Sequence, residues 1–173
     1  YSGSGKGGGF GLATSKDGVK WQRHGNAPVL LGNGGSMDPC VRKFDGRFHI
    51  WYVGQRGKSY RLFHATSADG IKWDKEPNPI LPLGNEGDFD ERHHAGPVVL
   101  RIGGSHYLFH LGGSSKGWKL GLAISTDGVT WKKSSVNPIL DVGGKSDWDG
   151  GSIMSHDVIW KDGRFHVWYA AHA

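Results

Sequence analysis

Three loops of this 173-residue chain carry the residue types that could do chemistry. They run over 34–39, 87–97 and 146–157, and each holds at least one carboxylate. Together they also hold three histidines and two aromatic side chains. Carboxylates accept hydrogen bonds from sugar hydroxyls, and aromatic rings stack on the apolar faces of sugars. The combination therefore favours a sugar as the ligand.

Several of these side chains also have purely structural interpretations. Asp38 could cap the turn before a strand, and Asp90 and Glu91 could be solvated charges of a loop. Trp148 and Asp149 could serve packing and the geometry of a turn. Both interpretations stay open for these five residues on sequence grounds.

The histidines of the loops are candidates for contacts with the ligand. His93 and His94 are neighbours in a strand-like segment, so their side chains should point to opposite faces, and we expect no shared metal ligation. His156 and Asp157 lie where a strand begins, and one of them should point inward. By repeat phase we align His156 with Asp38 and expect it to be the inward one. No metal site and no cofactor are predicted.

A repeated phrase shows which elements position these loops. It occurs as Ser15–Trp21, Ser67–Trp73 and Ser125–Trp131, with tryptophans 52 and 58 residues apart. A repeat of this period is typical of a stacked or radial array of one supersecondary unit. Its serine and aspartate can bind amides of their own turn, its glycine supplies a positive φ, and its tryptophan can pack between units. We interpret the phrase as structural.

The segments between the phrases predict four strands in each unit. Asp45-Gly46, Gly103-Gly104 and Asp162-Gly163 are dipeptides that two-residue hairpin turns prefer. A short edge strand or the start of a strand is expected in the proline-containing runs 27–30, 78–81 and 137–140. The predicted fold class is therefore all-β, a β-propeller of four-stranded antiparallel blades, with about three blades in this chain.

The phase of the repeats predicts how the blades divide the chain. Whole blades are expected at about 36–82 and 94–141, and a split blade is expected from 1–31 together with 152–173, since residues 1–5 match the segment after Trp51. Three interpretations follow: a fragment of a larger propeller, a homodimer that shares split blades to make six, or an open arc. Exposed edge strands at both ends would be a hazard for association, which favours an arrangement in which the ring is completed and these edges are covered.

Composition excludes some classes of protein. Thirty glycines and eight tryptophans argue against a helical protein. The net charge of +5 is scattered over turns and strand ends, so nucleic acid is not an expected partner. No stretch approaches the roughly 18 apolar residues of a membrane span, so no membrane partner is expected either. The single Cys40 should be a buried, inert thiol. Because the chain begins at Tyr1, we expect it to be processed, trimmed or partial.

The motifs together resemble those of a known superfamily. The phrase ATS-x-DG-x-x-W, followed by NP-[IV]-L, then W-D-x-G-G or M-D-P-C-V, then DG-R-F-H-x-W-Y, is similar to the five-bladed β-propeller glycosidases. These include the family 43 arabinanases and xylosidases, the family 32 fructosidases and the family 130 mannoside phosphorylases. The resemblance covers essentially the whole chain and implies a glycoside hydrolase that acts on a plant or microbial oligo- or polysaccharide.

The resemblance also implies roles for particular residues. Asp38 resembles the Asp-Pro aspartate that serves as base or nucleophile in these enzymes. Hydrolysis needs a second carboxyl group with a raised pKa. Family 43 supplies it from Glu-Gly-Pro, but Ala95 replaces that glutamate here, so we assign Glu91 as the acid with Asp90 as its competitor. A carboxyl separation of about 5–5.5 Å would indicate retention and about 6.5–9.5 Å inversion.

The remaining loop residues are expected to bind the sugar. They are Asp90, His93, His94, Trp148, Asp149, His156 and Asp157. An alternative is a non-catalytic module for glycan binding or assembly, because the Glu-Gly-Pro glutamate is missing and the repeats are few. The resemblance makes a secreted or periplasmic location an expectation.

Overall fold

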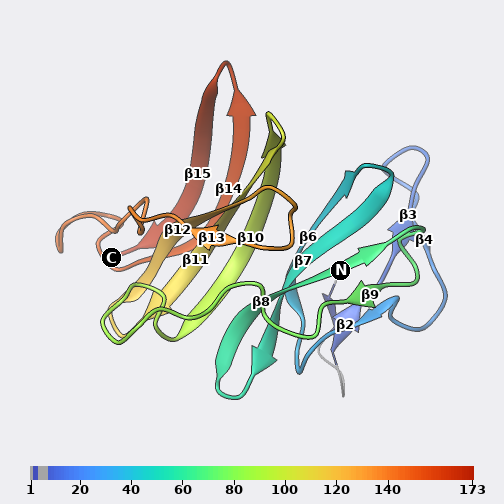
Figure 1. Ribbon diagram of the computed structural model, residues 1–173, viewed down its shortest axis with the longest axis horizontal. Helices are drawn as coiled ribbons and strands as arrows, with labels where there is room; N and C mark the ends of the chain where they lie inside the picture. Colours follow the sequence, from blue (N-terminus) through green and yellow to red (C-terminus); the bar gives the residue numbers. More distant parts are fainter. Residues whose placement is uncertain (1, 4–7) are drawn as a thin grey trace.

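The computed structural model describes residues 2–3 and 8–173, and its described part contains strands and no helix (Figure 1). The all-β prediction is confirmed. None of the described segments is therefore a helix that could cross a membrane. The strands are β1 (Ser2–Gly3), β2 (Gly9–Phe10), β3 (Ala13–Thr14), β4 (Gln22–Arg23), β5 (Leu30–Leu31), β6 (Met37–Phe44), β7 (Arg47–Arg56), β8 (Ser59–Ser67), β9 (Asp74–Lys75), β10 (His93–Ile102), β11 (Ser105–Ser114), β12 (Gly117–Ser125), β13 (Lys132–Lys133), β14 (Ser152–Lys161) and β15 (Arg164–His172).

Two complete blades form the middle of the molecule. Their strand orders are β6-β7-β8-β9 and β10-β11-β12-β13, and every pairing is antiparallel. Both central residues of the Asp45-Gly46 and Gly103-Gly104 turns have positive φ, as type I′ hairpins require. The predicted four-stranded antiparallel blade of a propeller is confirmed.

The outermost strand of each complete blade is not where the sequence placed it. β9 and β13 directly follow Trp73 and Trp131, whereas the runs 78–81 and 137–140 contribute no strand and only one isolated bridge, Leu120 to Leu140. In the blade β10–β13 the reason is visible at Asn137, whose side chain accepts from the Leu122 N–H at 2.9 Å and donates to its carbonyl at 3.0 Å. This amide occupies the edge that a strand would use.

The two ends of the arc are half-blades. β14 and β15 form a two-stranded sheet at one end, while β1-β2-β5 and β3-β4 form small sheets at the other (Figure 1). The two halves of the predicted split blade thus lie at opposite ends and do not pair with each other. Residues 1 and 4–7 of that prediction lie outside the described residues.

Side chains between the blades form the hydrophobic core. Trp51 and Leu62 of one complete blade pack with Val99, Leu108 and Ala123 of the next, and all five are fully buried. This interface fixes the relative positions of the inner strands β6 and β10. Residues near the starts of β6, β10 and β14 lie around one hollow.

Candidate functional site

The first residues of the three inner strands surround one hollow of about 270 Å³. It lies where β6, β10 and β14 begin, at the position that the central channel has in a propeller. Asp38 is the only carboxylate among the residues that line it. The lining residues are Asp38, Pro39, Ala95, Gly96, Pro97, Val98, Leu111, Met154, Ser155 and His156.

Strand pairing corrects the alignment that the repeats suggested. Trp51, Phe109 and Trp168 occupy equivalent positions, and they face Cys40, Val98 and Asp157. Asp157 is therefore the equivalent of Cys40 rather than of Pro39. Counting back one step further places His156 with Pro39.

Counting back two steps along the sequence gives Gly96 and Ser155. Gly96 shares the bulge of Asp38, whereas Ser155 pairs with Ala170 as Met37 pairs with Val53, because the bulge of β14 lies one residue earlier, at Met154. Asp38, Gly96 and Ser155 each lie seven positions before the first residue of their hairpin turn. His156 faces Tyr169, the equivalent of Tyr52, and Asp38 and Pro39 together lie opposite Tyr52, so the match of His156 with Asp38 stays a prediction. Ser155, which sequence reasoning missed, could have been found by this count back from the hairpin turns.

Asp38 has a backbone conformation that favours glycine. Its φ is +52°, and the equivalent Gly96 has a φ of +54°, so the β-bulge needs a left-handed residue in both blades. An aspartate tolerates this region less well than glycine does. Its carboxylate Oδ2 accepts a hydrogen bond from the Gly96 N–H at 3.2 Å. The exposed carboxylate is thus held against the neighbouring inner strand, at the hollow.

His156 lies on the opposite wall of the same hollow. Neither ring nitrogen has a partner among the described residues, and both are shielded from solvent. Burial lowers the pKa of His156 to about 4, against the opposing effects of the Phe109 carbonyl and the carboxylates of Asp157 and Asp38. His156 is therefore a neutral imidazole at pH 7.

Glu91 lines a different hollow from Asp38. Its carboxylate accepts hydrogen bonds from the N–H groups of Gly87 at 2.7 Å and Ser115 at 3.2 Å. These bonds, with the nearby Arg92 guanidinium, lower the pKa of Glu91. A general acid needs a raised pKa, so this environment does not favour the role in the absence of substrate.

Asp90 and His94 form a buried polar cluster with Lys133. The Asp90 carboxylate lies 2.9 Å from His94 Nε2 and 2.6 Å from Lys133 Nζ. Burial alone would raise the pKa of Asp90, but His94 and Lys133 outweigh it and lower that pKa to about 2. Asp90 and His94 are buried, so the cluster ties the second loop to β10 and β13.

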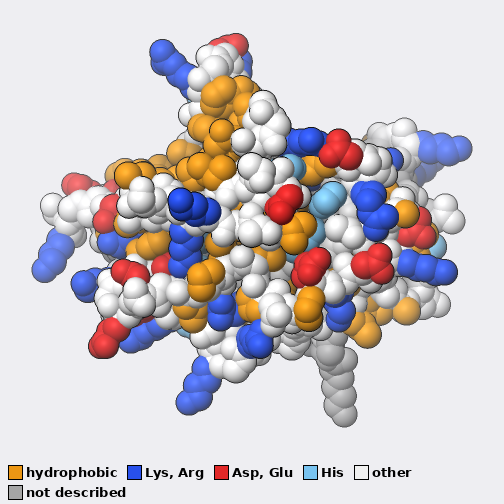
Figure 2. Space-filling model, in the orientation of Figure 1, with side chains coloured by type: hydrophobic (Ala, Val, Ile, Leu, Met, Phe, Trp, Pro, Cys, Tyr) orange, Lys and Arg blue, Asp and Glu red, His pale blue; other side chains and the backbone are white. Residues whose placement is uncertain are grey.

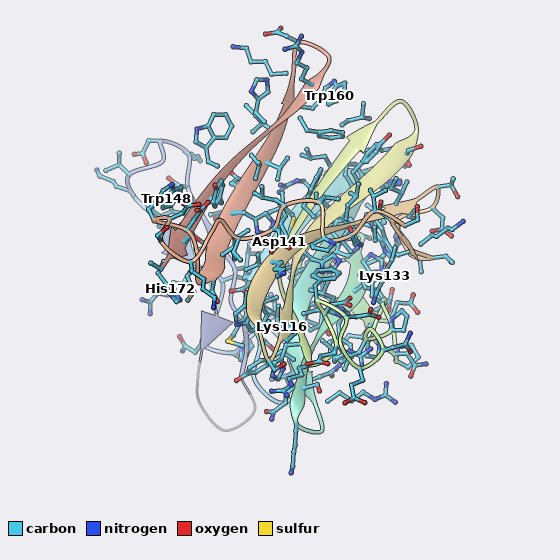
Figure 3. The ribbon with its side chains drawn as sticks, turned by 90° about the vertical axis from the view of Figure 1, so that its left-hand side faces the viewer. Lys116, Lys133, Asp141, Trp148, Trp160 and His172 are labelled. Atoms are coloured by element: carbon cyan, nitrogen blue, oxygen red, sulfur yellow. The ribbon has the colours of Figure 1, made fainter. Side chains whose placement is uncertain are left out.

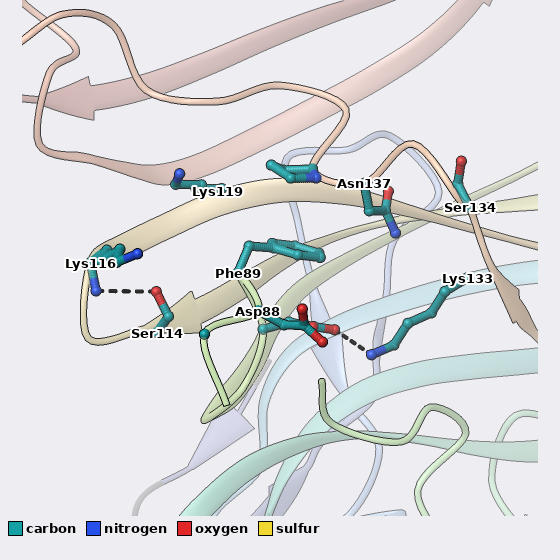
Figure 4. Close-up of a pocket in the computed structure, with 11 residues that line it drawn as sticks. Asp88, Phe89, Ser114, Lys116, Lys119, Lys133, Ser134 and Asn137 are labelled. Carbon is teal, nitrogen blue, oxygen red and sulfur yellow. Dashed lines mark hydrogen bonds and ion pairs between the residues drawn. The ribbon is translucent and has the colours of Figure 1, made fainter. Parts of the chain in front are cut away.

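The Asp90–Lys133 pair also lines a third hollow, of about 370 Å³ (Figure 4). Phe89, Lys116 and Lys119 line it as well. Lys119 is paired with Asp141 and Lys133 with Asp90, so two of its three ammonium groups are already neutralised.

The remaining predicted residues lie apart from the Asp38 hollow. Trp148 is 64% exposed and stacks on Tyr169 with ring centroids 5.5 Å apart, and Asp149 accepts a hydrogen bond from the Tyr169 hydroxyl at 2.8 Å. Asp157 is exposed and accepts from the N–H of Val158 at 2.9 Å.

His93 lies at the surface between two aromatic rings. Its ring stacks on that of Trp118, with centroids 5.8 Å apart, and its centroid lies 5.4 Å from that of the Tyr60 ring. The backbone N–H of Tyr60 donates to His93 Nδ1 at 3.1 Å. His94, its neighbour, is fully buried, so the two imidazoles face different surroundings. Of the nine predicted site residues, Asp38 and His156 therefore line the same hollow. Asp90 and His94 meet in the separate cluster with Lys133. Among the described residues no group of three or more potential ligands could hold a metal ion.

Comparison with known proteins places the chain among uncharacterised relatives. No protein-family model matches it. It is 28% identical over 119 residues to an uncharacterised protein of one Mycobacterium tuberculosis strain, covering 65% of this chain and 38% of that protein. It is 25% identical over 160 residues to an uncharacterised protein of another strain, covering 83% and 50%. The chain thus spans half or less of the length of these relatives.

Solved structures show which fold the chain shares. A family 117 glycoside hydrolase of the marine bacterium Zobellia galactanivorans superimposes with a TM-score of 0.68 at 20% identity, over 92% of this chain and 51% of that one. A GH32 β-fructofuranosidase of Bombyx mori gives 0.63 at 19% identity, over 92% and 35%. The chain has the fold of the propeller glycoside hydrolases, and it covers part of their length.

Proposed function

We propose that this chain forms part of a propeller glycoside hydrolase, with Asp38 as its catalytic base or nucleophile. The observation that carries the proposal is the left-handed backbone of Asp38 at a bulge where the next blade has Gly96. Non-glycine residues held in left-handed backbone cluster at functional sites. Asp38 combines this backbone with a place at the hollow, whereas the other left-handed aspartates, Asp45 and Asp162, lie in hairpin turns. The shared fold supports the same class of reaction.

The roles follow from the chemistry of glycosidic bonds. As a base, the Asp38 carboxylate would take a proton from the water that attacks the anomeric carbon, and a second group would protonate the leaving oxygen. Glu91 stays our prediction for that second group. Since its carboxylate is bound to Gly87 and Ser115, substrate would have to release it before it could hold a proton.

The other predicted loop residues keep a binding role in the proposal. His156 lines the same hollow as Asp38, and a rotation of its ring that exposes the shielded nitrogens would let the neutral imidazole donate to and accept from sugar hydroxyls. Ser155, which also lines the hollow, adds a hydroxyl. His93 and Trp148 remain predicted sugar contacts at the rim, whereas Asp90, His94, Asp149 and Asp157 would act from outside the hollow.

One observation favours a second candidate, a glycan-binding module without catalysis. Asp38 is the only carboxylate that lines the hollow, and hydrolysis needs two. A binding module would retain oligosaccharides without turning them over. The partner in either case would be an oligo- or polysaccharide.

The test is turnover of a panel of aryl glycosides by wild type, Asp38→Asn and Asp38→Gly. Both variants should lose at least about 100-fold in kcat/KM, since they remove the catalytic carboxylate. Asp38→Gly should stay folded, because Gly96 already occupies the equivalent left-handed position. Asp162→Gly, at a left-handed residue in the distant hairpin turn, is the matched control and should keep its activity.

The outcomes separate the candidates. Equal turnover in wild type and Asp38→Asn would refute catalysis by Asp38. Oligosaccharide binding by wild type without turnover would establish the binding module instead. A Glu91→Gln variant with unchanged kcat and an unchanged pH profile would remove Glu91 as the acid.

A further inference from the structure

The hollow of about 370 Å³ beside Lys116 has no part in the proposed reaction. None of the described residues that line it also lines the hollow at Asp38. Its walls come from the complete blade β10–β13 and from the loops before and after that blade. Figure 3 shows Lys116, Lys133 and Asp141 over this blade, away from Trp160 on the β14–β15 hairpin. Pockets for small ligands have volumes of about 300–1,000 Å³, so this hollow is large enough to hold one.

An aromatic ring lies at the centre of this hollow. Figure 4 shows the Phe89 ring between Lys119 on one side and Asp88 on the other. Gly121 of β12 makes room for the ring, because a Cβ there would lie 2.6 Å from it. The ring of His110 packs nearby, with centroids 6.0 Å apart. Phe89 stays partly exposed, so its ring offers a surface on which the apolar face of a ligand can stack.

The residue that follows this ring fixes its position. Asp90 is buried, and its carboxylate is bound to His94 Nε2 at 2.9 Å and to Lys133 Nζ at 2.6 Å. The loop is therefore tied to β10 and β13 directly beside Phe89. A ring that is held in place before the ligand arrives loses little conformational freedom on binding.

Three polar groups of the hollow have no partner among the described residues. The first is the ammonium group of Lys116, on the β11–β12 hairpin. The second is Oδ1 of Asp88, whose other oxygen accepts the Asn85 N–H at 2.7 Å. The third is the hydroxyl proton of Ser134, whose oxygen accepts the Val136 N–H at 3.4 Å. Two donors and one acceptor thus surround the ring, and sugar hydroxyls can both donate and accept.

The charges around the hollow balance. Lys119 and Lys133 each pair with a carboxylate at 2.6 Å. The carboxylate of Asp88 balances the remaining ammonium group, that of Lys116. Figure 2 shows basic and acidic side chains interspersed over the visible face of the molecule. Because no excess of cations would attract a polyanion to the described lining of this hollow, its surroundings favour a neutral ligand.

From the partly exposed ring, the three unpaired groups and the balanced charge, we propose that this hollow binds a neutral saccharide outside the catalytic centre. The apolar face of a sugar would stack on Phe89, while its hydroxyls would accept from Lys116 and Ser134 and donate to Asp88. The class of ligand rests on the proposed function, whereas the location of the site does not. Such a contact would retain a polymeric glycan on the protein between its encounters with Asp38.

An amide NMR titration with oligosaccharides tests the site. The probes are tetrasaccharides of arabinose, xylose, mannose and fructose, and they are added to Asp38→Asn so that none is consumed. At least one probe should shift the amides of residues 87–90, 114–119 and 133–134, with a Kd on the order of 1 mM. A tetrasaccharide of galacturonic acid is the charge control. It should bind no more tightly than the best neutral probe, because the charges of the hollow balance.

Two variants and a matched control locate the binding. Phe89→Leu keeps an apolar side chain beside Gly121 but removes the aromatic ring, so it should raise Kd about fivefold or more. Lys116→Ala removes a charged donor from an exposed hairpin and should raise Kd about tenfold. Lys132→Ala removes an exposed lysine beside Lys133 that does not line the hollow, and it should leave Kd unchanged.

Each outcome decides the proposal. Shifts confined to the amides around Asp38, or no shift with any probe, would overturn it. An affinity that neither Phe89→Leu nor Lys116→Ala weakens would overturn it as well, and galacturonate that binds more tightly than every neutral probe would overturn the neutral class of ligand. The readout is binding, so shifts at this hollow can support the site even if Asp38 turns over no glycan, and the two proposals fail separately.

Discussion

At the residue scale, the molecule places charged and polar groups in two kinds of surroundings. Asp38 is exposed, stands on left-handed backbone and faces a hollow. Asp90 is buried, has a pKa lowered to about 2 and is bound by His94 and Lys133. The first arrangement leaves a carboxylate free to meet a ligand, while the second uses a carboxylate to hold a loop. We therefore centre the candidate site on Asp38.

Residue types alone predicted Asp38 but could not separate these two surroundings. Asp90, Glu91 and His94 look equivalent to Asp38 in the sequence because all are polar loop residues. Their separation depends on Lys133 arriving from β13, about 40 residues later in the chain, and on backbone N–H groups that turn inward at Gly87. Such long-range partners leave no local pattern, so the sequence could nominate these residues but not assign their roles.

Buried histidines predict how stability depends on pH. Burial lowers the pKa to about 4 at His64 and His156 and to about 3 at His110. Below pH 6.5 the unfolded chain binds protons that the folded chain does not, so stability should be full above about pH 7 and fall as pH drops from 6.5 toward 4. Each histidine adds up to about 1.4 kcal/mol per pH unit to this slope.

Urea unfolding between pH 7.5 and 5 measures the effect. His110→Gln should reduce the slope by about one proton, whereas His24→Gln, on the exposed surface, should not change it. A stability that is flat across this range would contradict the neutral state of these buried imidazoles.

At the element scale, the repeated turn explains why every blade is built alike. In all three copies the serine hydroxyl accepts the glycine N–H at 2.8 Å, and the aspartate carboxylate accepts two later N–H groups at 2.7–2.9 Å. The tryptophan of the third copy then packs edge-on against Trp51 at 6.3 Å. The structural interpretation of the phrase fits these contacts.

The three copies differ in burial, and this difference predicts a graded effect of one substitution. Ser125 is buried and Ser15 is not. Ser125→Ala should lower the free energy of unfolding by about 1–2 kcal/mol, because its removal leaves shielded N–H groups without an acceptor. Ser15→Ala should cost about 0.5 kcal/mol or less, since water can replace the hydroxyl. Chemical denaturation of both variants checks the order, and equal losses would show that burial does not set the effect.

The outer strands show where element prediction fails. Asn-Pro-Ile-Leu has the composition of an edge strand, yet the side chain of Asn137 takes the hydrogen bonds that such a strand would make with Leu122. The actual strands β9 and β13 are only two residues long and largely polar, so their hydrophobic pattern is too short to detect. The inner strands are longer and are bounded by hairpin dipeptides, so their hydrophobic pattern could be recognised in the sequence.

At the scale of the whole molecule, the chain is an arc of two complete blades between two half-blades. The repeats predicted the blade and its class of fold, because each unit has the same strands and turns. They could not decide which residue of the third unit corresponds to Asp38, since the β-bulge of β14 lies at a different position from the β-bulges of β6 and β10.

The central claim is that the hollow around Asp38 is the glycan site of this propeller. A crystal structure of Asp38→Asn soaked with an oligosaccharide that the wild type hydrolyses or binds tests it most directly. Our account predicts a sugar ring at the heads of β6, β10 and β14, with the side chain of residue 38 within hydrogen-bond distance, about 2.6–3.2 Å, of the bound sugar or of one ordered water next to it. A sugar bound only elsewhere, for example on Trp148 or in the hollow beside Lys116, would contradict the claim.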